Sequence, residues 1–183
     1  MWSIEEVKED MKTRLSEARY NHCLRVMDVA KKLAEYYHYD VNKTMLTALA
    51  HDVLKELPKD QEEKWIQKDP TLATLPAKVR HGYMGAKFVE QQYGFDEEMA
   101  AAIACHTTGK KNMSLLDKIV FLADKIEPGK HYPGIEEERE LAFLDLDQAI
   151  ILCLQNQIRK LTRENRSVSP ASQETLAYLQ GIH

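Results

Sequence analysis

The chain has 183 residues and a formal net charge of −4, and 44% of its residues are hydrophobic while 30% are charged. This balance is typical of a globular protein, and the length suggests one domain with a sizeable core. The slight negative charge, without a block of lysine and arginine, argues against a nucleic-acid partner. Only seven glycines and few alternating β-branched runs favour helices over strands.

The sequence also argues against a membrane protein and against a disulfide-bonded one. The longest apolar stretch, Met99 to Cys105, is far shorter than the roughly 20 residues that a membrane span needs. The N-terminal segment is acidic and lacks the pattern of a signal peptide, so we expect a cytoplasmic protein without a membrane partner. The three cysteines, Cys23, Cys105 and Cys153, fit no disulfide framework or zinc motif and are expected in the core.

The first helices are predicted by apolar residues at helical spacing. A strong helix is expected from about Glu17 to Tyr37, with His22 on its apolar face. Asp40 or Asn42 can cap the next helix, which we expect to run as far as Leu57, where the following proline ends it.

Further helices are expected in the rest of the chain, each bounded by a capping residue, a proline or a glycine. In chain order they run from Pro76 to Gly94, from Asp96 to His106, from Ser114 to Pro128, from Leu141 to Leu161 and from Ser169 to Gly181. The predicted fold class is therefore all-α, a single-domain helical bundle over residues 1–183. Its metal-ligand core is expected at about 17–128 and its C-terminal helices at about 136–183.

The most informative feature is the pair His51-Asp52 inside an otherwise apolar helical run. Burying an imidazole and a carboxylate together is costly without a partner, and a metal ion satisfies both. Further candidate ligands stand on or at the end of their own predicted helices. The full candidate set is His22, His51, Asp52, His81, His106 and Asp124.

Each histidine alone is more often a hydrogen-bonded core residue, but the placement of the whole set on apolar faces indicates a shared metal site. Four histidines and no cysteine favour divalent transition metals, with iron expected and manganese or another as alternatives, over magnesium or calcium. Two such ions can clamp an in-line phosphoryl displacement, and Asp52 is the natural bridge between them.

Basic and hydroxyl groups near these ligands are candidates for holding phosphates. Lys55 is expected one helical turn after His51 and Arg19 three residues before His22, each on the same face, and Thr107 and Lys125 directly follow ligands. Two more candidates lie in or near the loop after the last ligand, Lys130 and Arg139. The alternative for each is a solvated surface charge or a helix-end hydrogen bond.

Several segments resemble the HD-domain metal-dependent phosphohydrolases of the YqeK type. They are AHDVLK at 50–55, HGYMGA at 81–86, CHTTG at 105–109 and ADKIEP at 123–128. The family is associated with symmetrical hydrolysis of diadenosine tetraphosphate to two ADP. The resemblance implies an HD-type helical fold, a small nucleotide as partner and a water nucleophile.

The resemblance also implies how the ligands divide between two metals. One metal would be held by His22, His51, Asp52 and Asp124, and the other by Asp52, His81 and His106. Asp52 and Lys55 are then the expected catalytic residues, and a homodimer is a possible assembly. Alternatives are another nucleotide phosphohydrolase, such as a nucleoside-phosphate phosphatase or an alarmone hydrolase, and a nucleotide-binding regulator with little catalysis.

Overall fold

The computed structural model describes residues 1–181, and these residues form ten α-helices, one 3-10 helix and no strand, which confirms the all-α prediction. The helices are α1 (Ile4–Arg14), α2 (Glu17–Tyr36), α3 (Val41–Ala50), α4 (Lys59–Lys68), η1 (Pro70–Thr74), α5 (Ala77–Tyr93), α6 (Glu97–Cys105), α7 (Leu115–Ile126), α8 (Ile135–Ala142), α9 (Leu146–Arg163) and α10 (Pro170–Leu179). Residues 182–183 of the predicted domain lie outside the described range.

Side-chain caps begin several helices where the sequence predicted them. The Asp40 carboxylate accepts from the Lys43 N–H at 2.9 Å, so Asp40 caps α3. Asp96 caps α6 in the same way, and Ser114 opens α7 with a capping box. These local hydrogen bonds fix where the ligand-bearing helices start.

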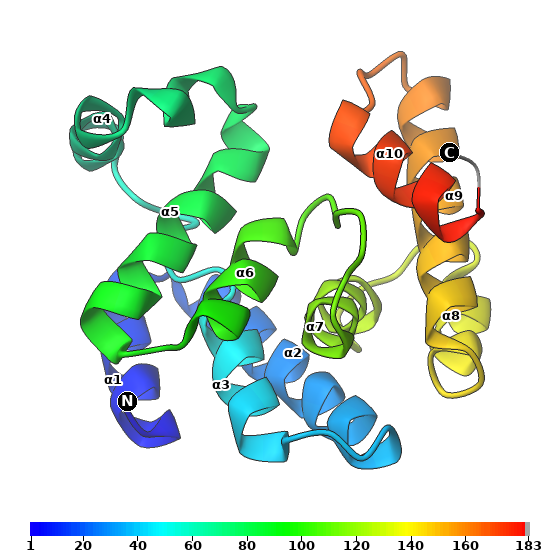
Figure 1. Cartoon of the computed structure of the whole chain (residues 1–183), viewed down its shortest axis with the longest axis horizontal. Helices are drawn as coiled ribbons and strands as arrows, with labels where there is room; N and C mark the ends of the chain where they lie inside the picture. The colour runs from blue at the N-terminus through cyan, green and yellow to red at the C-terminus, as the bar shows by residue number, and fades with distance from the viewer. Residues whose placement is uncertain (182–183) are drawn as a thin grey trace.

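Helix α7 lies at the centre of the bundle and contacts α2, α3, α6 and α9 (Figure 1). Helices α8, α9 and α10 pack together on one side of it, and α4 and α5 lie on the other side. One cluster of buried apolar side chains extends along the chain from Val7 to Leu154 and joins these groups. None of the described helices is both long enough and apolar enough to cross a membrane.

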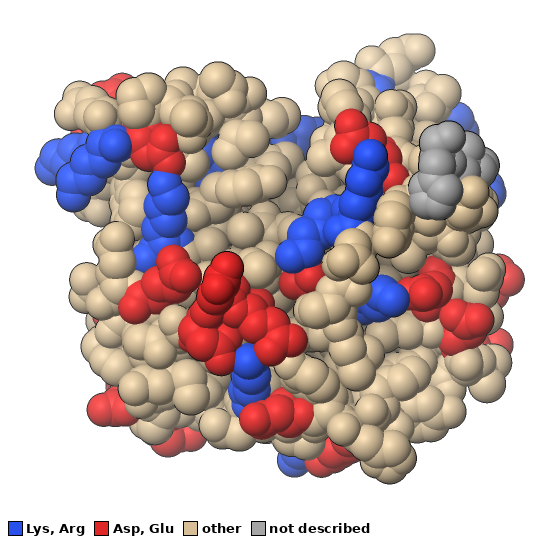
Figure 2. All heavy atoms as spheres, in the orientation of Figure 1, with Lys and Arg blue, Asp and Glu red and all other residues tan. Residues whose placement is uncertain are grey.

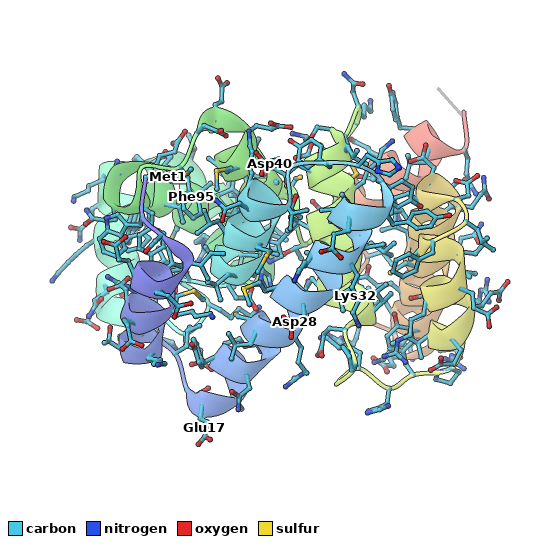
Figure 3. The ribbon with its side chains drawn as sticks, turned by 90° about the horizontal axis from the view of Figure 1, so that it is seen from below. Met1, Glu17, Asp28, Lys32, Asp40 and Phe95 are labelled. Carbon is cyan, nitrogen blue, oxygen red and sulfur yellow. The ribbon has the colours of Figure 1, made fainter. Side chains whose placement is uncertain are left out.

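The sequence prediction began with the helix at Glu17 and missed α1. Ser3 and Glu6 form a capping box there, which is a local signal that the sequence contains. The start of α1 is held against the end of α5, because the Trp2 N–H donates to the Tyr93 carbonyl at 2.8 Å. Figure 3 shows Met1 beside Phe95 at this junction.

Two predicted helix boundaries were wrong. Helix α3 ends at Ala50 rather than near Leu57, and residues 51–56 form successive turns with hydrogen bonds to the third residue back, such as Val53 N–H to Ala50 O at 3.0 Å. The helix predicted from Leu141 to Leu161 is two helices, because the chain breaks after Ala142 and Asp145 caps α9 through the Gln148 N–H. Both breaks are decided by local hydrogen bonds that apolar periodicity does not reveal.

Candidate metal centre

Two of the candidate histidines directly follow helices and are fixed by the last turn of each. His51 follows α3, and its Nδ1 donates to the Ala48 carbonyl at 2.6 Å. His106 follows α6, and its Nδ1 donates to the Ile103 carbonyl at 2.7 Å. Because a carbonyl only accepts, Nδ1 carries a proton in both rings, and each ring in its neutral form presents Nε2 as a lone pair.

His22, on α2, is oriented by a carboxylate from the other end of the centre. Its Nδ1 lies 3.2 Å from Oε1 of Glu127, which directly follows α7 and is 1% exposed. The Arg25 Nε donates to the other oxygen of Glu127 at 2.6 Å, and the Gly129 N–H donates to it at 2.7 Å. Because Glu127 is fixed in place and accepts from the Nδ1 of His22, the Nε2 of His22 is left to coordinate a metal.

The two carboxylate oxygens of Asp52 face different histidines. Its Oδ1 lies 3.1 Å from His81 Nε2 and 3.3 Å from His106 Nε2. Its Oδ2 lies 3.4 Å from His51 Nε2 and 3.7 Å from His22 Nε2. A single carboxylate therefore joins two clusters of ring nitrogens.

Asp124, on α7, completes the second of these clusters. Its Oδ1 lies 3.0 Å from His22 Nε2 and 3.3 Å from His51 Nε2. The six predicted residues thus form two groups in which the ligand atoms all lie within 4.8 Å of one another. The groups are His22, His51, Asp52 and Asp124, and Asp52, His81 and His106.

The polar atoms of this centre fit divalent cations. His51 Nε2 is buried and has no hydrogen-bond partner among the described residues. The Nε2 atoms of His81 and His106 lie 3.1 Å apart, although the proton of His106 is already on Nδ1. Two ring nitrogens that face one another, and a third that faces carboxylate oxygens without a hydrogen bond, suit a metal ion that accepts their lone pairs.

Burial and charge shift the pKa values of these groups strongly. Burial opposes the charge of His51, but the carboxylates of Asp52 and Asp124 outweigh it and raise the His51 pKa to about 10. Burial lowers the pKa of His81 to about 4. Both carboxyls keep a pKa well below the usual range in spite of burial, Asp52 mainly through His51 and Asp124 mainly through Lys125. The centre therefore holds two anionic carboxylates.

The predicted phosphate-binding residues are placed differently from one another. The Arg19 Nη1 donates to Asp52 Oδ2 at 3.0 Å, at the edge of the centre. The Lys125 Nζ donates to the His106 carbonyl at 2.6 Å and lies 3.4 Å from Asp124 Oδ2. Lys55 lies in the turns after α3 rather than on a regular helix, yet its charge still acts on the pKa of His81.

The remaining candidates line cavities or bind backbone carbonyls. Thr107 follows His106 and lines a small cavity, and Lys130 lines a larger one. Arg139 donates to the backbone carbonyls of Ile126, Glu127 and Lys130 and pairs with Glu136. Its guanidinium thus holds the loop after α7, and a phosphate contact by Arg139 stays a prediction.

Sequence reasoning missed Glu127, whose carboxylate orients His22. Glu127 stands three residues after Asp124, which puts both carboxylates at the same end of α7, and that spacing was the available signal. The cysteines were predicted correctly as core residues, since all three are buried. Burial raises the pKa of Cys105 and of Cys153 to about 12, so both remain thiols at neutral pH.

Comparison with known proteins agrees with this geometry. The HD domain family matches residues 19–129, a range that contains all six clustered residues. The chain is 40% identical to a symmetrical bis(5'-nucleosyl)-tetraphosphatase of Halalkalibacterium halodurans, over 91% of this chain and 90% of that protein. It is 36% identical to the protein of the same name in Bacillus subtilis, over 91% of each chain.

A solved structure has the same fold over its whole length. It is described as a predicted HD superfamily hydrolase involved in NAD metabolism from Clostridium acetobutylicum. The two chains are 32% identical, each is covered completely, and the TM-score is 0.91. The resemblance seen in the sequence is thereby confirmed. The chain belongs to the HD-domain family, in the group that includes the symmetrical bis(5'-nucleosyl)-tetraphosphatases.

Proposed function

We propose that this protein is a dimetal phosphohydrolase that cleaves diadenosine tetraphosphate symmetrically into two ADP. The observation that carries the proposal is the position of Asp52, whose two oxygens face two separate groups of histidine nitrogens. That arrangement suits a bridging ligand between two cations. The relatives named symmetrical tetraphosphatases support the substrate and the position of the cut.

The ligand groups suggest how two ions would be held. We assign one ion to His22, His51, Asp52 and Asp124, and the other to Asp52, His81 and His106. Imidazole-rich sites favour transition metals over magnesium and calcium, and among them we expect iron, with manganese or another as alternatives. Bound to these residues, two cations would supply an activated water near neutral pH and would neutralise charge on the reacting phosphate.

Side chains around the centre provide the other electrostatic contributions. The Arg19 guanidinium lies against Asp52 and can also donate to a phosphate oxygen at the edge of the centre. The His106 carbonyl holds the Lys125 ammonium beside Asp124, where it stabilises charge that develops on the leaving phosphate. Lys55 adds positive charge on the His81 side. The buried cysteines are protonated and make no nucleophile, so water attacks.

Separating products by chromatography tests this function directly. With added Fe²⁺ or Mn²⁺, diadenosine tetraphosphate should give ADP alone. AMP plus ATP would contradict the symmetrical cut, and phosphate released from mononucleotides would favour a phosphatase. NAD belongs in the same panel because of the relative described as involved in NAD metabolism. Tight nucleotide binding without turnover of any of them would point to a regulator.

Two further expectations belong to this proposal. A cytoplasmic location is consistent with a nucleotide substrate, and fractionation of cells tests it. A homodimer stays a prediction, which light scattering on the metal-loaded protein tests.

A further inference from the structure

A cavity of about 640 Å³ lies between the loop after α7 and helix α9. Five of the side chains that line it are cationic: Lys125, Lys130, Arg159, Lys160 and Arg163. Its described lining contains no aspartate or glutamate, although the whole chain has a net charge of −4. Positive charge is therefore concentrated here against the trend of the molecule, which marks a site for an anion.

Two carboxylates, Asp124 and Glu138, lie next to the lining of this cavity, but neither pairs with an α9 cation. Glu138, which is fully buried, has one carboxylate oxygen bonded to the Tyr132 hydroxyl and the other to Asn156 Nδ2 at 2.8 Å. The three α9 cations at positions 159, 160 and 163 make no ion pair among the described residues. Their charge is thus available to a ligand.

Lys125 connects this basic cavity to the candidate metal centre. Its Nζ lies 3.4 Å from Asp124 Oδ2, and the same side chain lines the cavity. A polyphosphate chain bound at the metal ligands would therefore need to extend only past Lys125 to reach the basic cavity. The next cations that it meets are those of α9 and Lys130.

A smaller cavity, of about 190 Å³, lies beside the other ligand group. It is lined by Thr107 and Thr108, which follow His106, and by Val79, which precedes His81 by two positions. The molecular surface is hollowed between the side formed by α5 and the side formed by α10 (Figure 2). Gln157 lines both cavities, and its Oε1 is buried without a hydrogen-bond partner in the described chain.

We propose that the basic cavity holds the nucleoside diphosphate half of the substrate that lies beyond the cleaved bond. Its phosphates lie against Lys125, Lys130 and the α9 cations, while the other half extends from the metal centre toward Thr107. The proposal rests on the proposed function, because it takes the reacting phosphates to lie at the clustered ligands. It makes α9 the helix that selects substrates with phosphates on both sides of the cut, since a mononucleotide fills only one cavity.

The test removes three positive charges from α9 and compares the effect on ADP binding with that of removing three positive charges elsewhere on the surface. The variant Arg159→Gln/Lys160→Gln/Arg163→Gln is compared with the control Lys32→Gln/Lys64→Gln/Lys68→Gln. The control residues are exposed on α2 and α4, and Lys32 is labelled in Figure 3. Calorimetric titration of the metal-loaded proteins measures the Kd of ADP at two salt concentrations.

The α9 variant should bind ADP about tenfold more weakly, with a shallower salt dependence, because each lost contact is a partly exposed charge interaction. The KM for diadenosine tetraphosphate should rise by a similar factor, and the control should stay within about twofold of the unaltered protein. Equal ADP affinity in both variants overturns the proposal. Should the triple variant not fold, Arg163→Gln alone should weaken ADP binding by about twofold to threefold, and no change there overturns it too.

The two proposals fail in different ways in this experiment. Binding of ADP requires no turnover, so it reports on the cavity even in a protein that cleaves nothing. If the α9 variant loses ADP affinity but the unaltered protein releases no ADP from the tetraphosphate, the proposed function is wrong and the anion site stands. If ADP is released while both variants bind it equally, the cavity assignment alone is wrong.

Discussion

Asp52 belongs to both ligand groups among the described residues, so replacing it should affect both proposed metals. Asp52→Ala should lower the rate of tetraphosphate hydrolysis by about a thousandfold or more, because the metal pair supplies several kcal/mol of transition-state stabilisation. Lys55→Ala removes a phosphate contact at most and should cost about tenfold to a hundredfold. Initial rates at saturating Mn²⁺ give both values.

Metal analysis of the same variants separates the two roles. Asp52→Ala should lose part of the bound metal, while Lys55→Ala should retain it. Asp52→Asn, which keeps the side-chain volume, provides the check that activity is lost through coordination and not through packing. Comparable residual rates in Asp52→Ala and Lys55→Ala would contradict the bridging role.

Glu127 should influence the metal through His22 without touching it. Burial raises the Glu127 pKa, but Arg25 and the Gly129 N–H more than offset this, so the carboxylate is anionic beside His22 Nδ1. Glu127→Ala should weaken metal affinity by about tenfold to a hundredfold, the range typical of groups that orient a ligand. Glu127→Gln keeps an acceptor for Nδ1 and should lose less, as competition with a chelating dye would measure.

Equal metal affinity in Glu127→Ala and the unaltered protein would contradict the proposed positioning role of Glu127. Arg25→Gln tests the next contact outward, since it releases one oxygen of the carboxylate without removing it. Its effect on metal affinity should be smaller than that of Glu127→Ala.

At the scale of helices, the loop between α6 and α7 packs directly on α10 through Gly109. This glycine has φ +68°, and a Cβ there would lie 2.6 Å from the Thr175 Cγ2. Gly181 has φ +74° with nothing within 4 Å of its Cβ position, so it provides a matched control. Gly181→Ala should cost about 1–3 kcal/mol of stability through backbone strain alone. Gly109→Ala should cost about 1–3 kcal/mol more, because Thr175 is fully buried and must move.

Urea unfolding monitored by circular dichroism measures both glycine variants. Equal urea midpoints for the two variants would show that α10 shifts to accommodate the added methyl group at little cost. Since the loop that holds Gly109 begins at His106, the larger loss should be accompanied by weaker metal binding in Gly109→Ala only.

The sequence predicted those features of the helices that depend on neighbouring residues. Asp40, Asp96 and Ser114 cap helices as expected, because a cap needs only a backbone N–H three residues away. The break at Asp145 was missed because apolar spacing continues across it. The early end of α3 was missed for a related reason: the turns after Ala50 keep apolar residues buried without a regular helix.

The candidate site also has a part that the sequence predicted and a part that it did not. Six residues that the structure clusters were found from sequence because each is a polar group at an apolar helix face or helix end. The pairing of Glu127 with His22, and the cavity that Lys125 shares with the α9 cations, depend on how distant helices pack. A basic face such as that of α9 is also common on helices that simply face solvent, so the spacing of its lysine and arginine residues alone does not indicate a site.

At the scale of the whole molecule, the clustered residues tie together α2, α5 and α7 and the turns after α3 and α6. A ligand that binds only the native state stabilises it by about 2.7 kcal/mol at a concentration of 100 times its Kd. Removing metal with a chelator should therefore lower the Tm by about 5–10 °C for a chain of this size. Scanning calorimetry with EDTA and with Mn²⁺ measures the shift, and the Tm of Asp52→Ala should respond less.

The same scans test whether residues 1–183 are one domain, as the sequence predicted. A single domain unfolds in one transition, with the calorimetric and van't Hoff enthalpies in agreement. Two separated transitions, of which only one shifts with metal, would instead divide the C-terminal helices from the metal-ligand core.

The hydrogen bonds from His51 and His106 to carbonyls of their own helices have a consequence for how the protein acquires its metal. Each ring is tethered to backbone three residues earlier in the chain, so its direction is set as soon as α3 and α6 have formed. Little side-chain freedom is left to be lost when an ion arrives. Loading is then a matter of diffusion and dehydration of the ion rather than of refolding, and a chain made when metal is scarce can wait in its folded form and become active within the time of an encounter.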